Sequence, residues 1–370
     1  MAPLFPFTPL IETLPTTIPF TGPEAIERQQ GTPFHVRIGA NESAFGISPK
    51  ARQAMVEAID HISWYNDPEN HDLREALAQH HTVSIHNIAV GGGIDDLLGL
   101  AVRAFLSPGQ IAVASLGSYP TYHYHVNGFG AKSHTVPYHN DRNDLNALLD
   151  AVHKTGSHLV YLSNPDNPAG TYHTTTELQA FVDQLPETCI FILDEAYIEF
   201  APENAVLPIS PIHPRLIRMR TFSKAHGMAG ARIGYAICDP EIVTAFEKIR
   251  LHFMVNRIAQ AGALASLHDP DFVQSVVRSV AQGRKEYEAL AKSVGLSSLP
   301  SATNFVTFDA HTPDRAGTIL NALQSQGVFV RKPGAPPLDR CFRVTVGTPE
   351  ERQAFAEILP AILAQIPEPK

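Results

Sequence analysis

Two hydrophobic periodicities alternate along the middle of the chain. Short, almost continuous apolar runs, which are typical of buried strands, occupy residues 87–93, 110–116, 157–163, 189–195, 215–222 and 232–238. Apolar residues at every third or fourth position, which are typical of amphipathic helices, occupy residues 48–62, 70–81, 94–106 and 174–185. This alternation predicts βαβ units and an α/β fold whose mainly parallel sheet is buried on both faces.

The two ends of the chain follow other patterns. Prolines interrupt both periodicities in residues 1–35, so we expect an extended arm there. Near the other end, a long helical pattern at 271–295 precedes shorter strand patterns at 304–310, 327–332 and 341–347. We therefore predict a large domain at 36–265 and a smaller α+β domain at 266–370, which the arm at 1–35 completes.

Composition narrows the class of partner and the compartment. Lys and Arg number 28 against 37 Asp and Glu, and the formal net charge of −9 argues against a general nucleic-acid binder. The three cysteines lie far apart in the sequence, so neither a metal knuckle nor a disulfide framework is indicated. The first residues lack the basic region of a signal peptide, and no apolar run is long enough to span a membrane. We expect a cytoplasmic protein that binds neither membrane nor nucleic acid.

Two of the many histidines stand close together in the sequence. His123 and His125 would share one face if residues 122–130 formed a strand, and such a pair could bind a metal. No carboxylate or cysteine lies nearby in the sequence, and polar surface histidines explain the pattern as well. We therefore predict no metal site.

Polar residues and glycines gather where four of the predicted strands end. The four groups are Gly91–Gly93 with Ile94 and Asp95, the segment 164–170 (NPDNPAG), Asp194–Tyr197, and Ser223–Lys224. Ligands of an open parallel sheet bind at the carboxyl ends of its strands. The sequence therefore predicts that these four groups meet at one site.

Each group also has an ordinary structural explanation. A glycine turn that opens a helix can hold an anion through backbone N–H groups and the helix dipole, with help from Arg232, but plain turns and surface arginines are common. Asp194 ends an apolar strand and needs a cationic partner if it is buried, although it could instead cap a helix. Lys224 stands among small residues, and burial would make its amine lose a proton easily, although a lysine in an exposed turn could have the same neighbours.

Taken together, the four strand ends describe one ligand. Donors for a phosphate, a carboxylate for a protonated ring nitrogen and an amine that forms a Schiff base fit pyridoxal 5′-phosphate (PLP). The sequence also resembles the fold-type I PLP-dependent aminotransferases of class I/II, especially the histidinol-phosphate aminotransferase branch. The resemblance runs in family order from about residue 37 to the carboxyl terminus and rests on IGANESAFGISP, WYNDPENHDLREALA, VGGGIDD, PTYHYH, NPDNPAG, LDEAYIEF, RTFSKAHGMAGARIGYA and FRVTVGTPEE. It implies a large PLP-transferase domain with a mixed sheet of the seven-stranded type.

The resemblance implies a role for each motif residue at the cofactor. Lys224 matches the lysine that holds PLP as a Schiff base and moves the substrate proton, and Asp194 matches the acid that pairs with the ring nitrogen. Tyr197, which we count with these two as catalytic, and Asn167 match the groups that hydrogen-bond to the ring oxygen. Tyr122 matches the aromatic residue that stacks on the ring. The cofactor phosphate would be held by Gly93, Ile94, Asp95, Thr221, Ser223 and Arg232, and by Tyr65 of a neighbouring subunit.

The resemblance further implies a homodimer with the active site at its interface, and it assigns the substrate contacts. Arg343 matches the arginine that binds the anionic end of the substrate, Arg331 is a candidate for a second anion contact, and Asn41 lies where the arm meets the substrate. Two positions depart from the branch. Phe20 stands where the arm usually places a tyrosine for the substrate phosphate, and Arg257 stands where a small residue is frequent.

The predicted activity is transfer of an amino group between an amino donor and a 2-oxo acid, with 2-oxoglutarate and glutamate as the expected pair. The other substrate would be histidinol phosphate with its 2-oxo partner, or an aromatic or other amino acid. A decarboxylase, lyase or oxidase on the same scaffold is an alternative, because sequence shows poorly which bond the pocket selects. A PLP-fold regulator would need a DNA-binding extension, for which the arm is too short and too rich in proline. A plain nucleotide-binding α/β protein is the remaining alternative.

Overall fold

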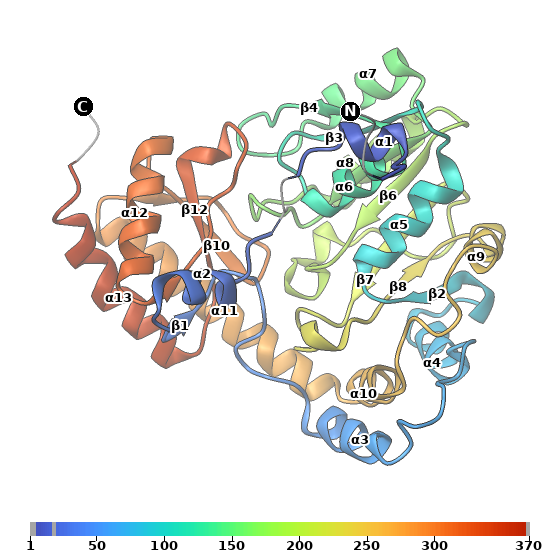
Figure 1. Cartoon of the computed structure of the whole chain (residues 1–370), viewed down its shortest axis with the longest axis horizontal. Coiled ribbons are helices and arrows are strands. Elements are labelled where there is room, and N and C mark those ends of the chain that lie inside the picture. The colour runs from blue at the N-terminus through green and yellow to red at the C-terminus, as the bar shows by residue number, and fades with distance from the viewer. Residues whose placement is uncertain (1–4, 17–19, 368–370) are drawn as a thin grey trace.

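The computed structural model describes residues 5–16 and 20–367 and has a large α/β part and a smaller α+β part, which lie side by side in Figure 1. Seven strands form the central sheet of the large part, in the order β2-β8-β7-β6-β5-β3-β4. They are β2 (Ile88–Gly91), β3 (Ile111–Ser115), β4 (Lys132–Val136), β5 (Leu159–Ser163), β6 (Ile190–Asp194), β7 (Leu216–Thr221) and β8 (Gly234–Ile237). Strand β8 is antiparallel to both of its neighbours, and the other neighbouring strands are parallel. The predicted α/β fold with a mixed, seven-stranded sheet is confirmed.

Helices cover both faces of this sheet. They are α4 (His71–His81), α5 (Ile94–Phe105), α6 (Pro120–Gly128), α7 (Leu145–Thr155), α8 (Thr175–Gln184), α9 (Pro240–Glu247) and α10 (Arg257–Leu267), and α3 (Pro49–Ile59) packs against α10. Alternate side chains of a strand point to opposite faces. Accordingly Leu159 and Tyr161 of β5 join a core with α5, α6 and α9, whereas Val160 and Leu162 join a core with α7 and α8. The near-continuous apolar runs of these strands follow from burial on both faces.

The smaller part contains two short sheets. One is antiparallel and has the order β12-β10-β9, formed by β9 (Ser297–Ser298), β10 (Phe305–Asp309) and β12 (Cys341–Thr345). The other pairs β1 (Val36–Arg37) in parallel with β11 (Val328–Phe329). Three helices complete it: α11 (Pro270–Ser293), α12 (Pro313–Ser325) and α13 (Pro349–Leu363). Because β1 pairs with β11, residues 36–37 lie with the smaller part, next to the boundary predicted at residue 36.

The prediction of an extended arm at residues 1–35 is wrong for two stretches of the described segment. Two helices form there, α1 (Pro9–Thr13) and α2 (Pro23–Gln30), and Figure 1 shows α2 beside β1. Pro9 and Pro23 each occupy the first helical position, where the missing N–H of proline has no intrahelical partner to lose. These prolines begin helices and do not interrupt them.

Candidate active site

A cavity of about 510 Å³ opens between the two parts, at the carboxyl ends of β5, β6 and β7. Five basic side chains line it, namely those of Lys224, Arg232, Arg331, Lys332 and Arg343. The acidic side chains in its lining are those of Glu42, Asp95 and Asp194. The excess of positive charge suits a ligand that carries more than one anionic group.

Lys224 lies three residues beyond β7, and its Nζ donates a hydrogen bond of 3.1 Å to the backbone oxygen of Asn41. The ring centre of Tyr197 lies 5.6 Å from the same nitrogen. Burial lowers the pKa of the Lys224 amine to about 8, with a further contribution from the positive charge of Arg343. An amine with such a pKa is partly unprotonated near neutral pH and can act as a nucleophile or a base.

Asp194 is the last residue of β6 and is only 4% exposed. Its carboxylate accepts hydrogen bonds from the Tyr161 hydroxyl at 2.7 Å and from the Ala196 N–H at 2.9 Å. No described Lys, Arg or His forms an ion pair with it, and burial raises its pKa to about 6. A buried carboxylate that faces a cavity and forms no ion pair with a described residue fits a ligand with a protonated ring nitrogen, as PLP has.

Tyr197 and Asn167 face the cavity from the loops after β6 and β5. The Asn41 amide nitrogen donates to the Tyr197 hydroxyl oxygen at 2.9 Å. The Asn167 side-chain oxygen accepts from Arg343. Burial raises the pKa of Tyr197 to about 12, so its hydroxyl stays protonated and can donate to a ligand oxygen.

The amino end of α5 forms the anion-binding corner of the cavity. Its N-cap, Gly93, has a φ of +88°, and the first N–H groups of a helix lack intrahelical partners. Arg232 contacts the Asp95 carboxylate at 3.1 Å and the Ser223 hydroxyl at 3.5 Å, and Ser223 accepts from the Thr221 hydroxyl at 2.9 Å. Apart from Tyr65, which was predicted to come from a neighbouring subunit, six residues were predicted to hold the phosphate. The structure brings these six together in one chain.

A second cationic corner lies at the smaller part. Arg331 and Arg343 are linked by backbone hydrogen bonds of 3.2 and 2.6 Å, and both line the cavity. Arg331 donates to the Thr21 oxygen at 2.9 Å and lies 5.5 Å from the ring centre of Phe20. The Nε atom of Arg343 is buried without a partner among the described residues, and burial lowers the pKa of the guanidinium to about 10. Such a group gains from an anionic ligand.

The structure does not place Tyr122 where the stacking role requires it. Tyr122 is fully buried beneath Tyr161, with ring centres 4.7 Å apart, and it does not line the cavity. Tyr119 lines the cavity instead and donates a hydrogen bond to Asp95. The difference arises because Pro120 begins helix α6, so Tyr119 precedes the helix while Tyr122 turns toward the sheet.

His123 and His125 lie on the same helix, not on a strand, so they do not share a face. His123 bonds to the hydroxyls of Ser118 and Ser133, and His125 donates to the backbone oxygen of Asp95 at 2.8 Å. Both histidines therefore have protein partners that fix their rings.

Tyr65 lies outside the cavity of its own chain. It is 78% exposed and stacks on Phe253 with ring centres 4.5 Å apart. Arg257 donates to the backbone oxygen of Tyr65 at 2.5 Å, so this arginine also packs outside the cavity. An exposed tyrosine at this position remains available to a second subunit.

The sequence reasoning missed several residues that face the cavity. They are Tyr119, Tyr161, Lys332 and Glu42. The signal for Tyr161 was present, because Ser163 pairs with Asp194 across β5 and β6 and a residue two positions earlier points to the same face. No comparable local pattern marks Lys332, which reaches the cavity from a loop between strands of the smaller part.

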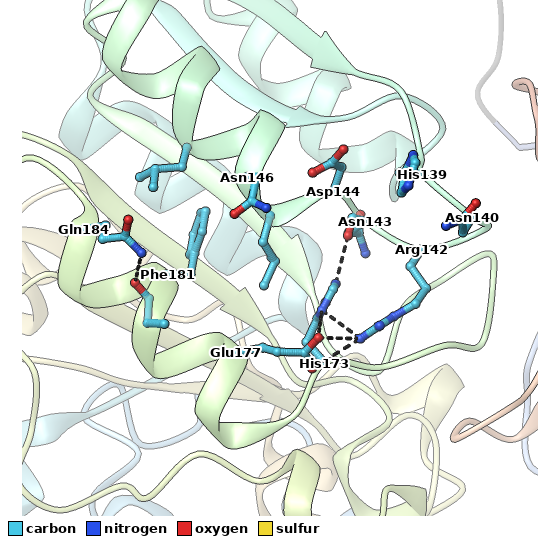
Figure 2. A pocket seen from close by; sticks show the side chains of 13 residues that line it. His139, Asn140, Arg142, Asn143, Asp144, Asn146, His173, Glu177, Phe181 and Gln184 are labelled. Atoms are coloured by element: carbon cyan, nitrogen blue, oxygen red, sulfur yellow. Dashed lines mark hydrogen bonds and ion pairs between the residues drawn. The ribbon is translucent and has the colours of Figure 1, made fainter.

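A second hollow of about 340 Å³ lies on the surface beside α7 and α8. Figure 2 shows Arg142, His173 and Glu177 joined by hydrogen bonds and ion pairs in it, and His173 also bonds to the backbone of Asn143. None of the residues predicted for the site lines this hollow. Arg142, His173 and Glu177 thus satisfy one another.

Comparison with known proteins decides the family. The model of the aminotransferase class I and II family matches residues 35–359. The chain belongs to this family. It is 35% identical to histidinol-phosphate aminotransferase 2 of Carboxydothermus hydrogenoformans, over 95% of this chain and 98% of that protein. It is 36% identical to histidinol-phosphate aminotransferase 2 of Ralstonia nicotianae, over 89% of each chain.

A solved structure agrees with the sequence relatives. The crystal structure of histidinol-phosphate aminotransferase from Sinorhizobium meliloti, in complex with pyridoxal-5′-phosphate, is similar with a TM-score of 0.95 and 46% identity, over 98% of this chain and 99% of that one. The predicted class, a PLP-dependent aminotransferase of the histidinol-phosphate aminotransferase-like branch, is confirmed. The comparisons do not favour the decarboxylase, lyase and oxidase alternatives. Among the described residues, no helix is both long and apolar enough to span a bilayer.

Proposed function

We propose that this aminotransferase acts as a cytoplasmic homodimer and exchanges the amino group of histidinol phosphate with 2-oxoglutarate. The names of its relatives support this choice of substrate. The cavity supports it as well, because cationic groups stand at both ends of a space that a phosphorylated cofactor and an anionic substrate would share.

One observation carries the proposal. Lys224, whose amine has a lowered pKa, and Asp194, a buried carboxyl without an ion-pair partner in the described chain, line the same cavity. They extend from the ends of adjacent, parallel strands, β7 and β6. A ligand that carries an aldehyde on one side of its ring and a basic nitrogen on the other satisfies both residues.

Each residue then has a task. When bound, PLP supplies a carbonyl for Schiff-base exchange and a ring that accepts electrons from the substrate. Asp194 would hold a proton on the ring nitrogen, and Tyr197 and Asn167 would bind the ring oxygen. Lys224 would carry the cofactor covalently and then move a proton at the α-carbon of the substrate.

The two cationic corners would divide the anions between them. The amino end of α5, Thr221, Ser223 and Arg232 would hold the cofactor phosphate through backbone, hydroxyl and guanidinium donors. Arg343 and Arg331 would bind the phosphate of histidinol phosphate or the carboxylates of 2-oxoglutarate. Phe20 contributes no hydroxyl there, so the arginines would bear this recognition.

An exposed apolar surface supports the proposed dimer. It consists of large side chains that are all more than 40% exposed, namely Ile59, Ile62, Trp64, Tyr65, Leu251, Phe253 and Met254. Contiguous apolar patches of this kind mark protein interfaces. A second copy that covers this surface would bring its own Tyr65 toward the cavity of the first.

The substrate is tested with purified protein, 2-oxoglutarate and a panel of donors, with glutamate formation as the readout. We expect histidinol phosphate to exceed histidinol by roughly 10- to 100-fold in kcat/KM, because each charge-assisted hydrogen bond to the phosphate contributes about 1.5 to 3 kcal/mol. Aspartate and phenylalanine serve as competing donors. Equal rates for histidinol and its phosphate, or faster turnover of an aromatic amino acid, would refute the proposed substrate.

A further inference from the structure

Asn41 occupies a central position that its predicted role as a substrate contact does not explain. It is only 1% exposed and has a φ of +56°, in the left-handed region. It contacts Thr345 of β12, Tyr197 after β6 and Lys224 after β7. One residue thus contacts the smaller part through Thr345 and also contacts two of the predicted catalytic residues, Tyr197 and Lys224.

The structure orients the Asn41 amide so that each hydrogen bond around it pairs one donor with one acceptor. Its backbone N–H, which can only donate, bonds to the Thr345 hydroxyl oxygen at 2.9 Å. That hydroxyl is then free to donate to the Asn41 side-chain oxygen at 3.2 Å. In this orientation the amide oxygen faces Thr345, and the amide nitrogen faces the Tyr197 hydroxyl oxygen at 2.9 Å and donates to it.

This direction fixes the proton of Tyr197. A phenol has one hydrogen to donate, and its oxygen already accepts from Asn41. The Tyr197 hydrogen cannot point toward the Asn41 amide nitrogen, which is itself a donor. It therefore points into the cavity that Tyr197 lines. The backbone oxygen of Asn41 meanwhile accepts from Lys224 at 3.1 Å and from the Asn304 amide at 3.0 Å, so it helps to hold the amine beside Tyr197.

We propose that Asn41 is a positioning residue, which turns the Tyr197 O–H toward the ring oxygen of the cofactor, and whose backbone oxygen holds the Lys224 amine when that amine is not joined to the cofactor. The inference rests on the proposed function, because it requires PLP in this cavity. A hydrogen bond donated to an anionic ring oxygen favours the unprotonated cofactor. Removing either Tyr197 or the residue that orients it therefore makes the bound cofactor easier to protonate.

The test uses the pH dependence of the absorbance of bound PLP in the substrate-free enzyme. Asn41→Gly keeps the left-handed backbone at no steric cost and removes the amide. We expect Tyr197→Phe to raise the pKa of the absorbance change by about 0.5 to 1, the value of one lost hydrogen bond. Asn41→Gly should raise this pKa in the same direction, and Asn41→Gly with Tyr197→Phe should raise it no further than Tyr197→Phe alone.

Thr345→Val is the second variant, because it removes the hydroxyl that orients the amide and leaves Asn41 in place. We expect a smaller rise of the same pKa, which also disappears in the Tyr197→Phe background. Additive effects of Asn41→Gly and Tyr197→Phe, or a raised KM with an unchanged absorbance titration, would overturn the inference. Failure of borohydride to fix PLP on Lys224 in the parent enzyme would overturn the proposed function itself.

Discussion

Lys224 and Asp194 take their unusual protonation behaviour from where the chain places them. Each lies at or just beyond the end of a buried strand and is removed from water, and each therefore favours its neutral form. Burying a lysine with a pKa of about 8 and a carboxyl with a pKa of about 6 does not stabilise the folded chain, because burial disfavours the charged form of each. They are suited to a partner that supplies the missing charge, which is the physical reason to assign them to a cofactor.

At the residue scale, Lys224→Ala should abolish covalent attachment of PLP and lower turnover by at least roughly 10³-fold, because one amine serves as covalent carrier and proton carrier. Borohydride reduction followed by peptide mass spectrometry measures the attachment, and glutamate formation measures the turnover. Lys248→Ala, which changes an exposed lysine, is the control and should behave like the parent. Near-parental activity of the Lys224 variant would exclude the mechanism.

Asp194→Asn should change the free energy of unfolding and the enzymatic activity in opposite directions at pH 8. In the cofactor-free parent the folded pKa of about 6 exceeds the unfolded value of 3.8, so the folded state holds the extra proton in this window. The free energy of unfolding of the parent therefore falls as pH rises from about 4 to 6 and stays lower above it, by roughly 2 to 3 kcal/mol.

The amide in Asp194→Asn carries no such charge, so the variant should be the more stable protein at pH 8 and should lose this advantage at pH 4. Urea unfolding of the cofactor-free proteins at both pH values checks the sign. With PLP present the parent should be the more active protein, since an amide cannot pair with a protonated ring nitrogen. A variant that is less stable than the parent at pH 8 would contradict the assigned burial cost.

At the scale of elements, the strand ends were readable from the sequence because a buried strand leaves a long apolar run and its polar end stands out. Asp194 at the end of β6 and Lys224 just beyond β7 were found in this way. Tyr119 was missed because the position where α6 begins decides whether it or Tyr122 reaches the cavity. The helices of the arm were missed because proline both breaks helices and begins them, and only the tertiary contacts decide which.

Gly93 at the start of α5 tests the anion corner. An added Cβ would lie 2.6 Å from Arg232 Nη2, and the φ of +88° is strained for any side chain. Gly93→Ala should therefore displace Arg232 and weaken PLP binding by at least about 10-fold, the value of one charge-assisted hydrogen bond. Gly109→Ala is a matched control, because it has a φ of +87° and open space around the added methyl group. Equal affinities of the two variants for PLP, measured by fluorescence titration, would exclude a role for this corner.

At the scale of the whole molecule, residues from both parts of the fold line the cavity. The large sheet supplies Asp194 and Lys224, the smaller part supplies Arg331 and Arg343, and the segment before α3 supplies Asn41. Such shared construction couples the relative placement of the two parts to the geometry of the site. The exposed apolar surface around Tyr65 extends the same argument from parts of one chain to two chains.

A hybrid dimer tests whether Tyr65 serves the partner subunit. Lys224→Ala and Tyr65→Ala chains with different affinity tags are co-expressed, and the mixed dimer is isolated through both tags. If Tyr65 reaches across, one site combines intact Lys224 with intact Tyr65 while the other site carries both defects. The hybrid should then show about half the activity of a parent dimer and exceed the mean of the two variant homodimers. A hybrid whose activity equals that mean would place the role of Tyr65 within its own chain.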